Sequence, residues 1–599
     1  MQTTLRKWEY YGTTETFSSL YEESKNGLKF HNLYDKIISR ENILLAFRSI
    51  KTNKGSQTAG VDKITIGKFK NLSQDEFVEL IRNKLLNYQP KKVKRVMIPK
   101  SNGKLRPLGI PSMLDRLIQQ MFKQVLEPIA EAKFYKHSYG FRPLRGAHHA
   151  KARIDTLINI HGYHYAVDVD IEGFFDNVNH TILIKQLWNM GIQDKRVLAI
   201  ISKMLKAPID KIGIPTKGTP QGGILSPLLA NVYLHDLDMW VAGQWELFET
   251  NKPCDDFRTR YRMQAKTNLK KGFLIRYADD FKIMCKDSKT AWKWFHAVNN
   301  YLQKHLKLNM SKEKSRVLNL RKKPTEFLGF KIKAVAKGKK YFAKSNITDK
   351  KVKEIASNIR EKIIGVQKSP NKNHISGINS VILGAQNYFK YATHVYKDFN
   401  TISYNLSRTL HNRFKGLATY GYVITSNTTY NKYYGHVKRK TYKLGTAILF
   451  PIAGVKHQNN MNFSQSVTPF TEEGRKLIHR SLENIIETEI ISLMKSNSGT
   501  RSLEYMDNRL SRYSMKKGKC EITGQFLIAN EVHCHHFVPL ELGGDDSFSN
   551  LRIVQQLVHK VIHAKSKKAV DMYLNLLKPN SKELSKINRY RKACKLELI

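Results

Sequence analysis

The chain has 599 residues and a formal net charge of +52, so its length predicts several domains and its charge predicts a polyanionic partner such as a phosphate backbone. No segment approaches the roughly 20 apolar residues of a membrane span, and residues 1–6 lack the apolar core of a signal peptide. The five cysteines form no disulfide framework, which indicates a cytoplasmic protein.

The N-terminal part of the chain predicts helices followed by a basic hairpin. Residues 1–90 are polar with helical spacing, and a loop is expected at residues 53–56. Residues 91–111 form two cationic segments around the turn Ser101-Asn102-Gly103, which is typical of a β-hairpin. Apolar side chains recur at helical spacing over residues 113–133 and predict a helix there.

An acidic centre is predicted from two strand segments far apart in the sequence. Residues 163–170 alternate like a strand and place Asp168 and Asp170 on one face. Residues 273–285 consist of two apolar runs around a polar turn, a hairpin that presents Asp279 and Asp280. Neighbouring carboxylates repel unless a cation lies between them, so this layout indicates a nucleotidyl transferase with two Mg²⁺ ions.

The C-terminal half changes character along its length. Residues 252–272 form a basic, exposed connection, and three helices are expected between residues 346 and 416. Residues 420–515 are weakly patterned, although residues 433–442 mix cations with aromatic side chains, as single-strand binders do. Cysteine and histidine concentrate between residues 520 and 563.

The chain resembles the group II intron-encoded reverse transcriptase/maturases, and the matching blocks follow that family's order. The blocks lie at residues 106–111, 137–143, 170–180, 218–231, 277–280, 311–314, 327–330 and 387–392. The resemblance implies an α/β multidomain protein: a right-hand polymerase with fingers and palm, a helical thumb (maturase) domain, and a small ββα-metal HNH domain. The implied divisions are an N-terminal extension with the start of the fingers (1–90), fingers and palm (91–340), thumb (341–450), a DNA-binding region (451–515) and the HNH endonuclease domain (516–599).

The resemblance also implies roles for the acidic residues. Asp170 and Asp279 would bridge two Mg²⁺ ions, Asp280 would complete the carboxylate set, and the backbone carbonyl of Ile171 would add a ligand. Asp168 is the competing candidate on the strand, and the family's pattern, which begins at Asp170, disfavours it.

Four further residues are implied to contact the incoming deoxynucleotide. Lys100 and Arg106 straddle the basic hairpin turn, where an ammonium and a planar guanidinium suit phosphate oxygens; the alternative is a hairpin that faces RNA in general. Phe175 would crowd the ribose 2′ position, unless it is an ordinary core aromatic. Gln221 would lie near the nascent base pair, beside glycines that permit close approach of the backbone.

The C-terminal histidines resemble a His-Asn-His nuclease motif that holds one divalent metal. His559 and His563 are four residues apart and share a helix face, whereas the adjacent His535 and His536 point to opposite sides of a strand. By resemblance His535, His559 and His563 bind the metal, with His563 alternatively on the scissile phosphate. His536 would be the general base, held by a loop that Asn550 supports. The alternative is a set of structural histidines or a nuclease fold without activity.

The sequence departs from many relatives in its cysteines. Only Cys520 remains of the first Cys-x-x-Cys pair, and no second pair precedes His559, so a four-cysteine zinc site is excluded by count. We expect an apolar core in its place. His533 has no assigned role, and a metal site that it shares with Cys534 stays an alternative.

The implied partners are a group II intron RNA and a DNA target, with no membrane contact, in the bacterial cytoplasm or nucleoid; the oligomeric state is open. The implied function combines RNA-directed DNA synthesis, intron splicing and DNA nicking in support of retrohoming. Three alternatives stay open: a splicing cofactor without polymerase activity, a reverse transcriptase with another task, and an RNA-dependent RNA polymerase. The intact carboxylate set opposes the first, the maturase-like thumb and nuclease-like tail oppose the second, and Phe175 and the Tyr-Ala-Asp-Asp sequence oppose the third.

Overall fold

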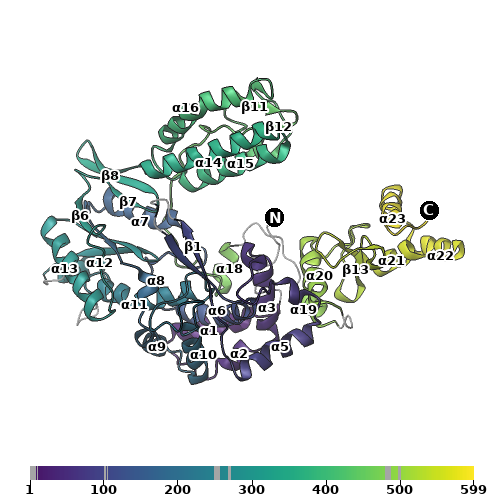
Figure 1. Ribbon diagram of the computed structural model, residues 1–599, viewed down its shortest axis with the longest axis horizontal. Helices are drawn as coiled ribbons and strands as arrows, with labels where there is room; N and C mark the ends of the chain where they lie inside the picture. The colour runs from purple at the N-terminus through teal and green to yellow at the C-terminus, as the bar shows by residue number, and fades with distance from the viewer. Residues whose placement is uncertain are drawn as a thin grey trace. The chain divides into compact units, whose positions relative to one another are not determined.

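The computed structural model describes residues 9, 11–99, 103, 105–248, 256–266, 271–478, 487–496 and 501–599 (Figure 1). The chain divides into two compact units, each built from separate stretches of sequence. The first unit comprises Met1–Phe134, Phe175–Tyr233 and Ser466–Ile599, and the second comprises Tyr135–Phe174 and Leu234–Gln465. None of the helices in these described ranges has the length and apolar character that a membrane span requires.

The N-terminal part of the first unit is helical, as the sequence predicts. Ser73 and Glu76 form a reciprocal capping box that begins one of these helices, and the expected loop at residues 53–56 is a single 3₁₀ turn, Lys54–Gln57. The helices are α1 (Thr14–Lys25), α2 (Tyr34–Ile37), α3 (Arg40–Lys51), α4 (Gly67–Lys70), α5 (Gln74–Leu86) and α6 (Met113–Glu131). Helices α1 and α3 pack on α6, whose buried side is largely apolar.

The predicted basic hairpin is confirmed as β1 (Lys94–Pro99) and β2 (Leu105–Ile110), which pair antiparallel. It packs on the loop at residues 218–223, where the amide of Gly109 donates to the carbonyl of Gln221 at 2.6 Å. A Cβ at Gly222 would lie 2.4 Å from the Gly109 oxygen, and its φ is +116°, so only glycine fits. The helices around this loop are α8 (Phe174–Asn177), α9 (His180–Asn189), α10 (Lys195–Leu205) and the start of α11 (Ser226–Gly243).

A four-stranded antiparallel sheet forms the centre of the second unit. Its strand order is β4 (Gly272–Tyr277), β5 (Asp280–Cys285), β3 (Tyr165–Asp170) and β6 (Arg316–Asn319), which confirms both predicted strand segments. Helix α13 (Ser288–Lys304) packs on β3, β5 and β6, and α7 (Ala147–Asn159) packs on β4. In the expected basic connection the structure has a helix, α12 (Phe257–Ala265), whose Arg258 and Arg262 are exposed.

The three helices expected between residues 346 and 416 are present as α14 (Asp349–Lys368), α15 (Lys372–Phe389) and α16 (Val395–Phe414), which pack side by side (Figure 1). Ile355, Ile359 and Ile363 are buried along α14, while Lys353 and Arg360 are exposed on its other side. Before these helices lie β7 (Thr325–Phe327), β8 (Phe330–Lys337) and β9 (Lys340–Ile347); after them lie β10 (Thr419–Gly421), α17 (Thr428–Tyr434), β11 (Thr441–Leu444) and β12 (Ala447–Ile448).

The last part of the first unit contains a short two-stranded sheet that packs against two helices. The strands β13 (Val532–His536) and β14 (Leu551–Gln555) pair antiparallel and run directly into α21 (Gln556–His563). The other helices of this stretch are α18 (Glu472–Ile478), α19 (Glu487–Lys495), α20 (Leu503–Met515), α22 (Lys567–Leu577) and α23 (Ser581–Ala593); α20 packs on β14, and α22 and α23 pack on α21.

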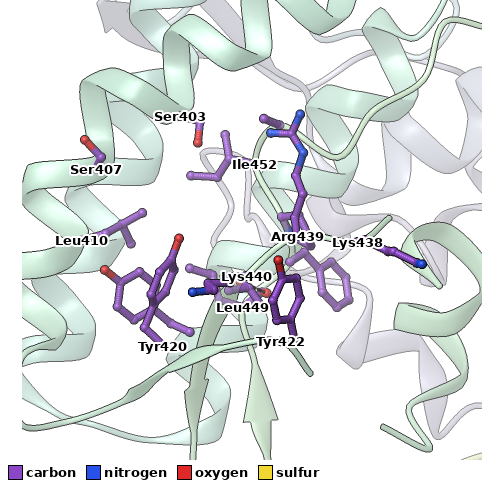
Figure 2. A pocket seen from close by; sticks show the side chains of 15 residues that line it. Ser403, Ser407, Leu410, Tyr420, Tyr422, Lys438, Arg439, Lys440, Leu449 and Ile452 are labelled. Carbon is purple, nitrogen blue, oxygen red and sulfur yellow. Dashed lines mark hydrogen bonds between the residues drawn. The ribbon is translucent and has the colours of Figure 1, made fainter. Parts of the chain in front are cut away.

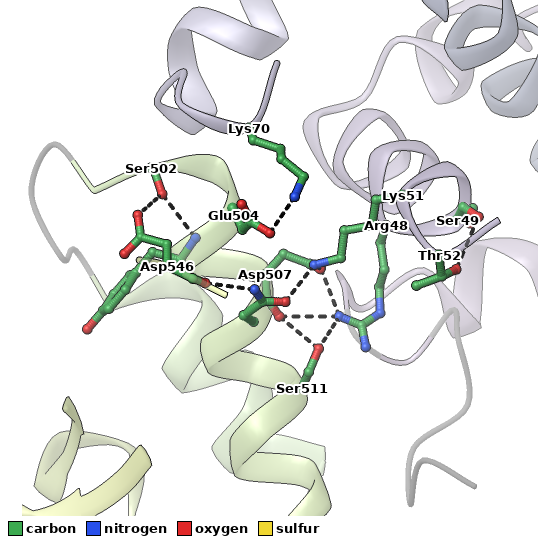
Figure 3. A network of polar contacts seen from close by, with 12 residues as sticks. Arg48, Ser49, Lys51, Thr52, Lys70, Ser502, Glu504, Asp507, Ser511 and Asp546 are labelled. Atoms are coloured by element: carbon green, nitrogen blue, oxygen red, sulfur yellow. Dashed lines mark hydrogen bonds and ion pairs between the residues drawn. The ribbon is translucent and has the colours of Figure 1, made fainter. Parts of the chain in front are cut away.

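Helix α20 is joined to the N-terminal helices by a buried charge cluster (Figure 3). Asp507 is fully buried; its carboxylate pairs with Arg48 at 2.8 Å and with Lys51, and it accepts a hydrogen bond from the Tyr11 hydroxyl at 2.7 Å. Burial alone would raise the pKa of Asp507, but Arg48 and Lys51 outweigh burial and hold that pKa well below its usual range. The cluster therefore fixes α20 on α3 through a fully buried carboxylate and two cations that are largely shielded from water.

Replacing Asp507 by Ala leaves two cations without their buried partner, so we expect the free energy of unfolding to fall by about 3–5 kcal/mol. Glu504→Ala is the matched control on the same helix, because it removes the more exposed pair with Lys70 and is expected to cost about 0–1 kcal/mol. Urea unfolding of the full chain, followed by tryptophan fluorescence, measures both. Equal decreases in the free energy of unfolding of the two variants would contradict the proposed contribution of the Asp507 cluster to stability.

Candidate active sites

The three predicted carboxylates lie at one end of the central sheet. Strand β3 pairs with β5 so that Asp170 lies opposite Asp280, and β4 pairs with β5 so that Tyr277 also lies opposite Asp280. Ala278 and Asp279 form the two-residue turn between β4 and β5, and Ala278 has a φ of +58°. The strand register therefore brings Asp170 and Asp280 together, with Asp279 one residue away in the turn.

A buried arginine fixes that turn. The Nε and Nη2 atoms of Arg276 donate to the two carboxylate oxygens of Asp238, at 2.7 and 2.6 Å, and neither side chain is exposed. A further Arg276 nitrogen donates to the carbonyl of Ala278 at 2.9 Å. A Cβ at Gly140 would lie 2.3 Å from the Ala278 nitrogen, so glycine is required where the chain passes the turn. Sequence reasoning did not assign Arg276 or Asp238, since nothing in their local pattern pairs them.

Asp170 is held through its backbone and its side chain. Its carbonyl accepts from the amide of Ser311 at 2.8 Å, and its amide donates to the Ser315 hydroxyl at 3.1 Å. The Lys314 ammonium lies 3.1 and 3.3 Å from the two carboxylate oxygens. Ile171, the predicted carbonyl ligand, is buried and bridges to Met310.

Asp168, the competing strand carboxylate, has other partners. It is buried and pairs with the Lys282 ammonium at 2.8 Å, and it accepts from the Thr325 hydroxyl at 2.8 Å. These contacts account for both of its oxygens, because Lys282 pairs with Oδ1 and Thr325 donates to Oδ2. Asp168 is thus built into the sheet interior, whereas Asp170 is partly exposed at the sheet end.

The electrostatics of the carboxylate set favour a bound cation. Burial raises the pKa of Asp280 to about 6; Lys282 opposes the shift, and Asp168, Asp279 and Asp170 add to it. Hard divalent cations take oxygen ligands, and Asp170, Asp279 and Asp280 supply several at one place. These residues fit Mg²⁺ by donor type, and a bound cation would relieve their mutual repulsion.

The predicted nucleotide contacts lie in the first unit. Lys100 falls outside the described residues. The Arg106 Nε donates to the Gln221 amide oxygen at 2.8 Å, so the structure brings these two together. Phe175 is buried, and its carbonyl accepts from the amide of Thr219 at 2.7 Å. A cavity of about 280 Å³ lies between the hairpin and the loop, with Arg95, Lys217 and Gln221 in its wall.

The C-terminal histidines gather around β13 and α21. The ring centroids of His535 lie 5.4 Å from His559 and 5.1 Å from His563, and the last two are 4.5 Å apart. His559 also lies against His533, with ring centroids 3.6 Å apart. Burial, with the neighbouring histidines, lowers the pKa of His535 to about 2 and that of His559 to about 3. Both imidazoles are therefore neutral near pH 7, the form that coordinates metals.

His536 lies apart from that cluster and has a carboxylate partner. Its Nε2 lies 2.8 Å from the Asp546 Oδ1, and Asp546 also accepts from the Ser502 hydroxyl. Asn550 bridges the loop after β13: it accepts from the Val538 amide at 2.8 Å and donates to the Val538 carbonyl at 2.9 Å. These hydrogen bonds fix the loop after β13, and the role of Asn550 in a nuclease site stays a prediction. Asp546 was not anticipated, although a carboxylate in the loop between the strands was a visible signal.

The cationic, aromatic run at residues 433–442 contributes to a cavity of about 370 Å³ in the second unit (Figure 2). Tyr420, Tyr422, Arg439 and Lys440 line this cavity, and both tyrosine rings are largely exposed. Tyr434 belongs instead to the core, where its hydroxyl donates to Gln386 at 2.5 Å. The cavity therefore combines aromatic faces with cations, the two elements that bind single-stranded nucleic acid.

Comparison with known proteins places residues 98–332 in the family described as reverse transcriptase (RNA-dependent DNA polymerase). Protein YkfC of Escherichia coli is 31% identical over 309 residues, which cover 48% of this chain and 80% of that protein. Group II intron-encoded protein LtrA of Lactococcus lactis is 31% identical over 370 residues, 54% of this chain and 61% of LtrA. An uncharacterized 91 kDa protein in the cob intron of Schizosaccharomyces pombe is 31% identical over 337 residues, 50% of this chain and 41% of that protein. The matched region thus spans less than two thirds of the length of LtrA and of the Schizosaccharomyces pombe protein.

The raised pKa of Asp280 predicts a pH-dependent stability in the absence of metal. Because the folded pKa of about 6 exceeds the usual 3.8, the folded protein loses stability as pH rises between these values. Asp280→Asn removes the charge, so in chelator at pH 7 we expect it to be about 1–3 kcal/mol more stable than wild type, with the difference vanishing near pH 4. Unfolding curves across this pH range measure the difference. A stability difference between Asp280→Asn and wild type that does not change with pH would contradict the raised pKa of Asp280.

Proposed function

We propose that this chain, which belongs to the reverse transcriptase family, synthesises DNA on an RNA template at Asp170, Asp279 and Asp280. The observation that supports this most is the β3–β5 register, which sets Asp170 opposite Asp280 with Asp279 in the adjoining turn. These carboxylates would hold two Mg²⁺ ions, which when bound activate the primer 3′-hydroxyl and stabilise the leaving pyrophosphate. Asp168 would take no part, because Lys282 and Thr325 bind both its oxygens.

The chain's own residues would position the reactants. Arg276 keeps the Ala278–Asp279 turn fixed, so the carboxylates need no reorganisation when the cations bind. Lys314 neutralises Asp170 while the metal is absent and would give way to it, since its side chain is largely exposed. Arg106, oriented by Gln221, would offer its remaining donors to the triphosphate of a deoxynucleotide, together with Lys100.

We further propose that the protein binds a group II intron RNA and promotes its splicing. LtrA is by its name a group II intron-encoded protein, and the yeast relative lies in the cob intron. The net charge of +52 and the exposed Lys353 and Arg360 on α14 suit a large folded RNA, which is held through phosphate contacts and shape. The aromatic and cationic cavity at Tyr420 and Tyr422 would stack unpaired bases.

The third proposed activity is nicking of a DNA target by the β13–β14–α21 segment, in support of retrohoming. His536 would take a proton from the attacking water, and Asp546 would hold the imidazole in the required orientation. His535, His559 and His563 would supply metal ligands, and Asn550 would keep the intervening loop in place. The competing function is that of a splicing cofactor with neither enzymatic activity. Variants that lose DNA synthesis or nicking distinguish this function from the enzymatic one.

Asp279→Ala is expected to reduce DNA synthesis by about 10³-fold or more, because a metal ligand contributes several kcal/mol to the transition state. Splicing of the bound intron should remain within a few fold. Primer extension on an RNA template with Mg²⁺, and a splicing assay on the same preparations, measure both; Glu313→Ala, an exposed carboxylate, is the control. Normal extension by the Asp279 variant would reject the polymerase site.

His536→Ala is expected to abolish DNA nicking and to leave primer extension unchanged, since the base is lost while the carboxylate centre is untouched. The exposed His31 provides the control, and His31→Ala should nick normally. Nicking of a plasmid that contains the insertion site, by the protein–RNA complex, is the readout. Nicking at the wild-type rate would reject His536 as the base.

A further inference from the structure

Cys594 lies beside two of the C-terminal histidines, although at least 31 residues separate it from either in the sequence. One ligand atom from each of His535, His563 and Cys594 lies within 4.8 Å of the other two. His535 is 2% exposed and Cys594 is 9% exposed, whereas His563 lies at the surface, so two of the three residues are shielded from solvent and the third is accessible to it. His559 lies against His533 and is not part of this group of three.

The spacing of the two histidines suits a shared metal. The His563 Nε2 lies 3.3 Å from the His535 Nδ1. Two nitrogens bound to one tetrahedral zinc at about 2.0–2.1 Å are themselves about 3.3–3.4 Å apart. The other nitrogen of His535, Nε2, is buried and has no hydrogen-bond partner among the described residues. The histidine pair is therefore already at the separation that a bound zinc would impose.

The position of Cys594 is set by the fold rather than by a loose C-terminal segment. Arg591, three residues earlier, is buried and donates to the carbonyls of Val561 at 2.9 Å and Ala564 at 2.8 Å, at the end of α21. His563 lies between these two residues. The Tyr590 ring stacks on His535 at a centroid distance of 5.6 Å. These contacts tie the end of α23 to both histidines, so the thiol is held where a third ligand would be needed.

We propose that His535, His563 and Cys594 together bind one Zn²⁺ ion. A thiolate is a soft ligand that selects zinc over Mg²⁺, and two neutral imidazoles complete a set of three protein ligands. On binding, the thiol loses its proton to solvent and the sulfur–metal bond forms. Three protein ligands leave a fourth position open, as in zinc sites that carry water or a substrate oxygen.

The zinc site rests on the proposed nuclease function and uses two of its three proposed metal-binding histidines, with Cys594 in place of His559, but metal binding is measurable without any cleavage. It goes beyond the histidine set implied by the sequence because Cys594 decides the metal: histidines and an asparagine alone leave the choice open. It also assigns a role to the last helix, which holds the ligand through Arg591.

Titration of the chelator-treated full-length protein with Co²⁺ tests the proposal. We expect one equivalent to give the near-ultraviolet sulfur-to-cobalt absorption and the intense visible bands of a tetrahedral site, both abolished by Zn²⁺ and unaffected by excess Mg²⁺. Cobalt at the carboxylates gives neither signal. Cys594→Ser should lose the sulfur band and weaken Zn²⁺ binding at least about 100-fold. Cys520→Ser, which changes another buried thiol in the same region, should retain both.

A Cys594→His variant and a primer-extension assay are the controls for this titration. The histidine variant should bind Zn²⁺ without the sulfur band, and normal primer extension by each variant shows that the protein remains folded. Wild-type protein without the band, or Cys594→Ser protein that retains it, would overturn the zinc site. DNA nicking with Mg²⁺ by protein that shows no sulfur-to-cobalt band would overturn the zinc site but support the proposed nuclease activity. Zinc binding through Cys594 without any nicking would keep the site and reject the nuclease.

Discussion

Mutual repulsion of closely spaced carboxylates is the constraint that organises the second unit. Asp170, Asp279 and Asp280 are gathered at one end of the sheet by strand register, and Asp168 lies two residues inside it. Cations hold three of these four positions: Lys282 pairs with Asp168, Lys314 pairs with Asp170, and Arg276 binds the turn that contains Asp279. Ion pairs of this kind, buried or exposed, add little net stability, so their value here is that they fix the geometry of the carboxylates.

Ion pairs also fix the geometry of the first unit. The charge of Asp507 is buried among Arg48, Lys51 and Tyr11, and it joins the N-terminal helices to α20 and so to the histidine-rich end of the chain. Close backbone approach is the second recurring device. Gly222 beneath Gly109 and Gly140 beside Ala278 allow contacts that any side chain would prevent. Both devices place polar groups precisely in a protein whose surface is otherwise dominated by positive charge.

Sequence patterns predicted what depends on local periodicity. The hairpins at residues 91–111 and 273–285, the strand before Asp170, and the three helices after residue 346 follow from alternation and helical spacing, and the structure confirms them. Contacts between distant segments had no such signal. Arg276 and Asp238 are 38 residues apart, and Cys594 lies near His563 at the end of a helix that Arg591 ties to the end of α21. Residues 420–450 appeared unpatterned because their strands are two to four residues long, too short for a period to emerge.

The central claim is that Asp170, Asp279 and Asp280, and not Asp168, hold the catalytic metals. Anomalous diffraction from crystals of the protein with Mn²⁺, an RNA template, a DNA primer and a non-reactive deoxynucleotide tests it most directly. We expect two manganese peaks ligated by Asp170 and Asp279, with Asp280 adjacent and Asp168 still paired with Lys282. Manganese bound through Asp168, or no manganese at the sheet end while primer and nucleotide are in place, would contradict it.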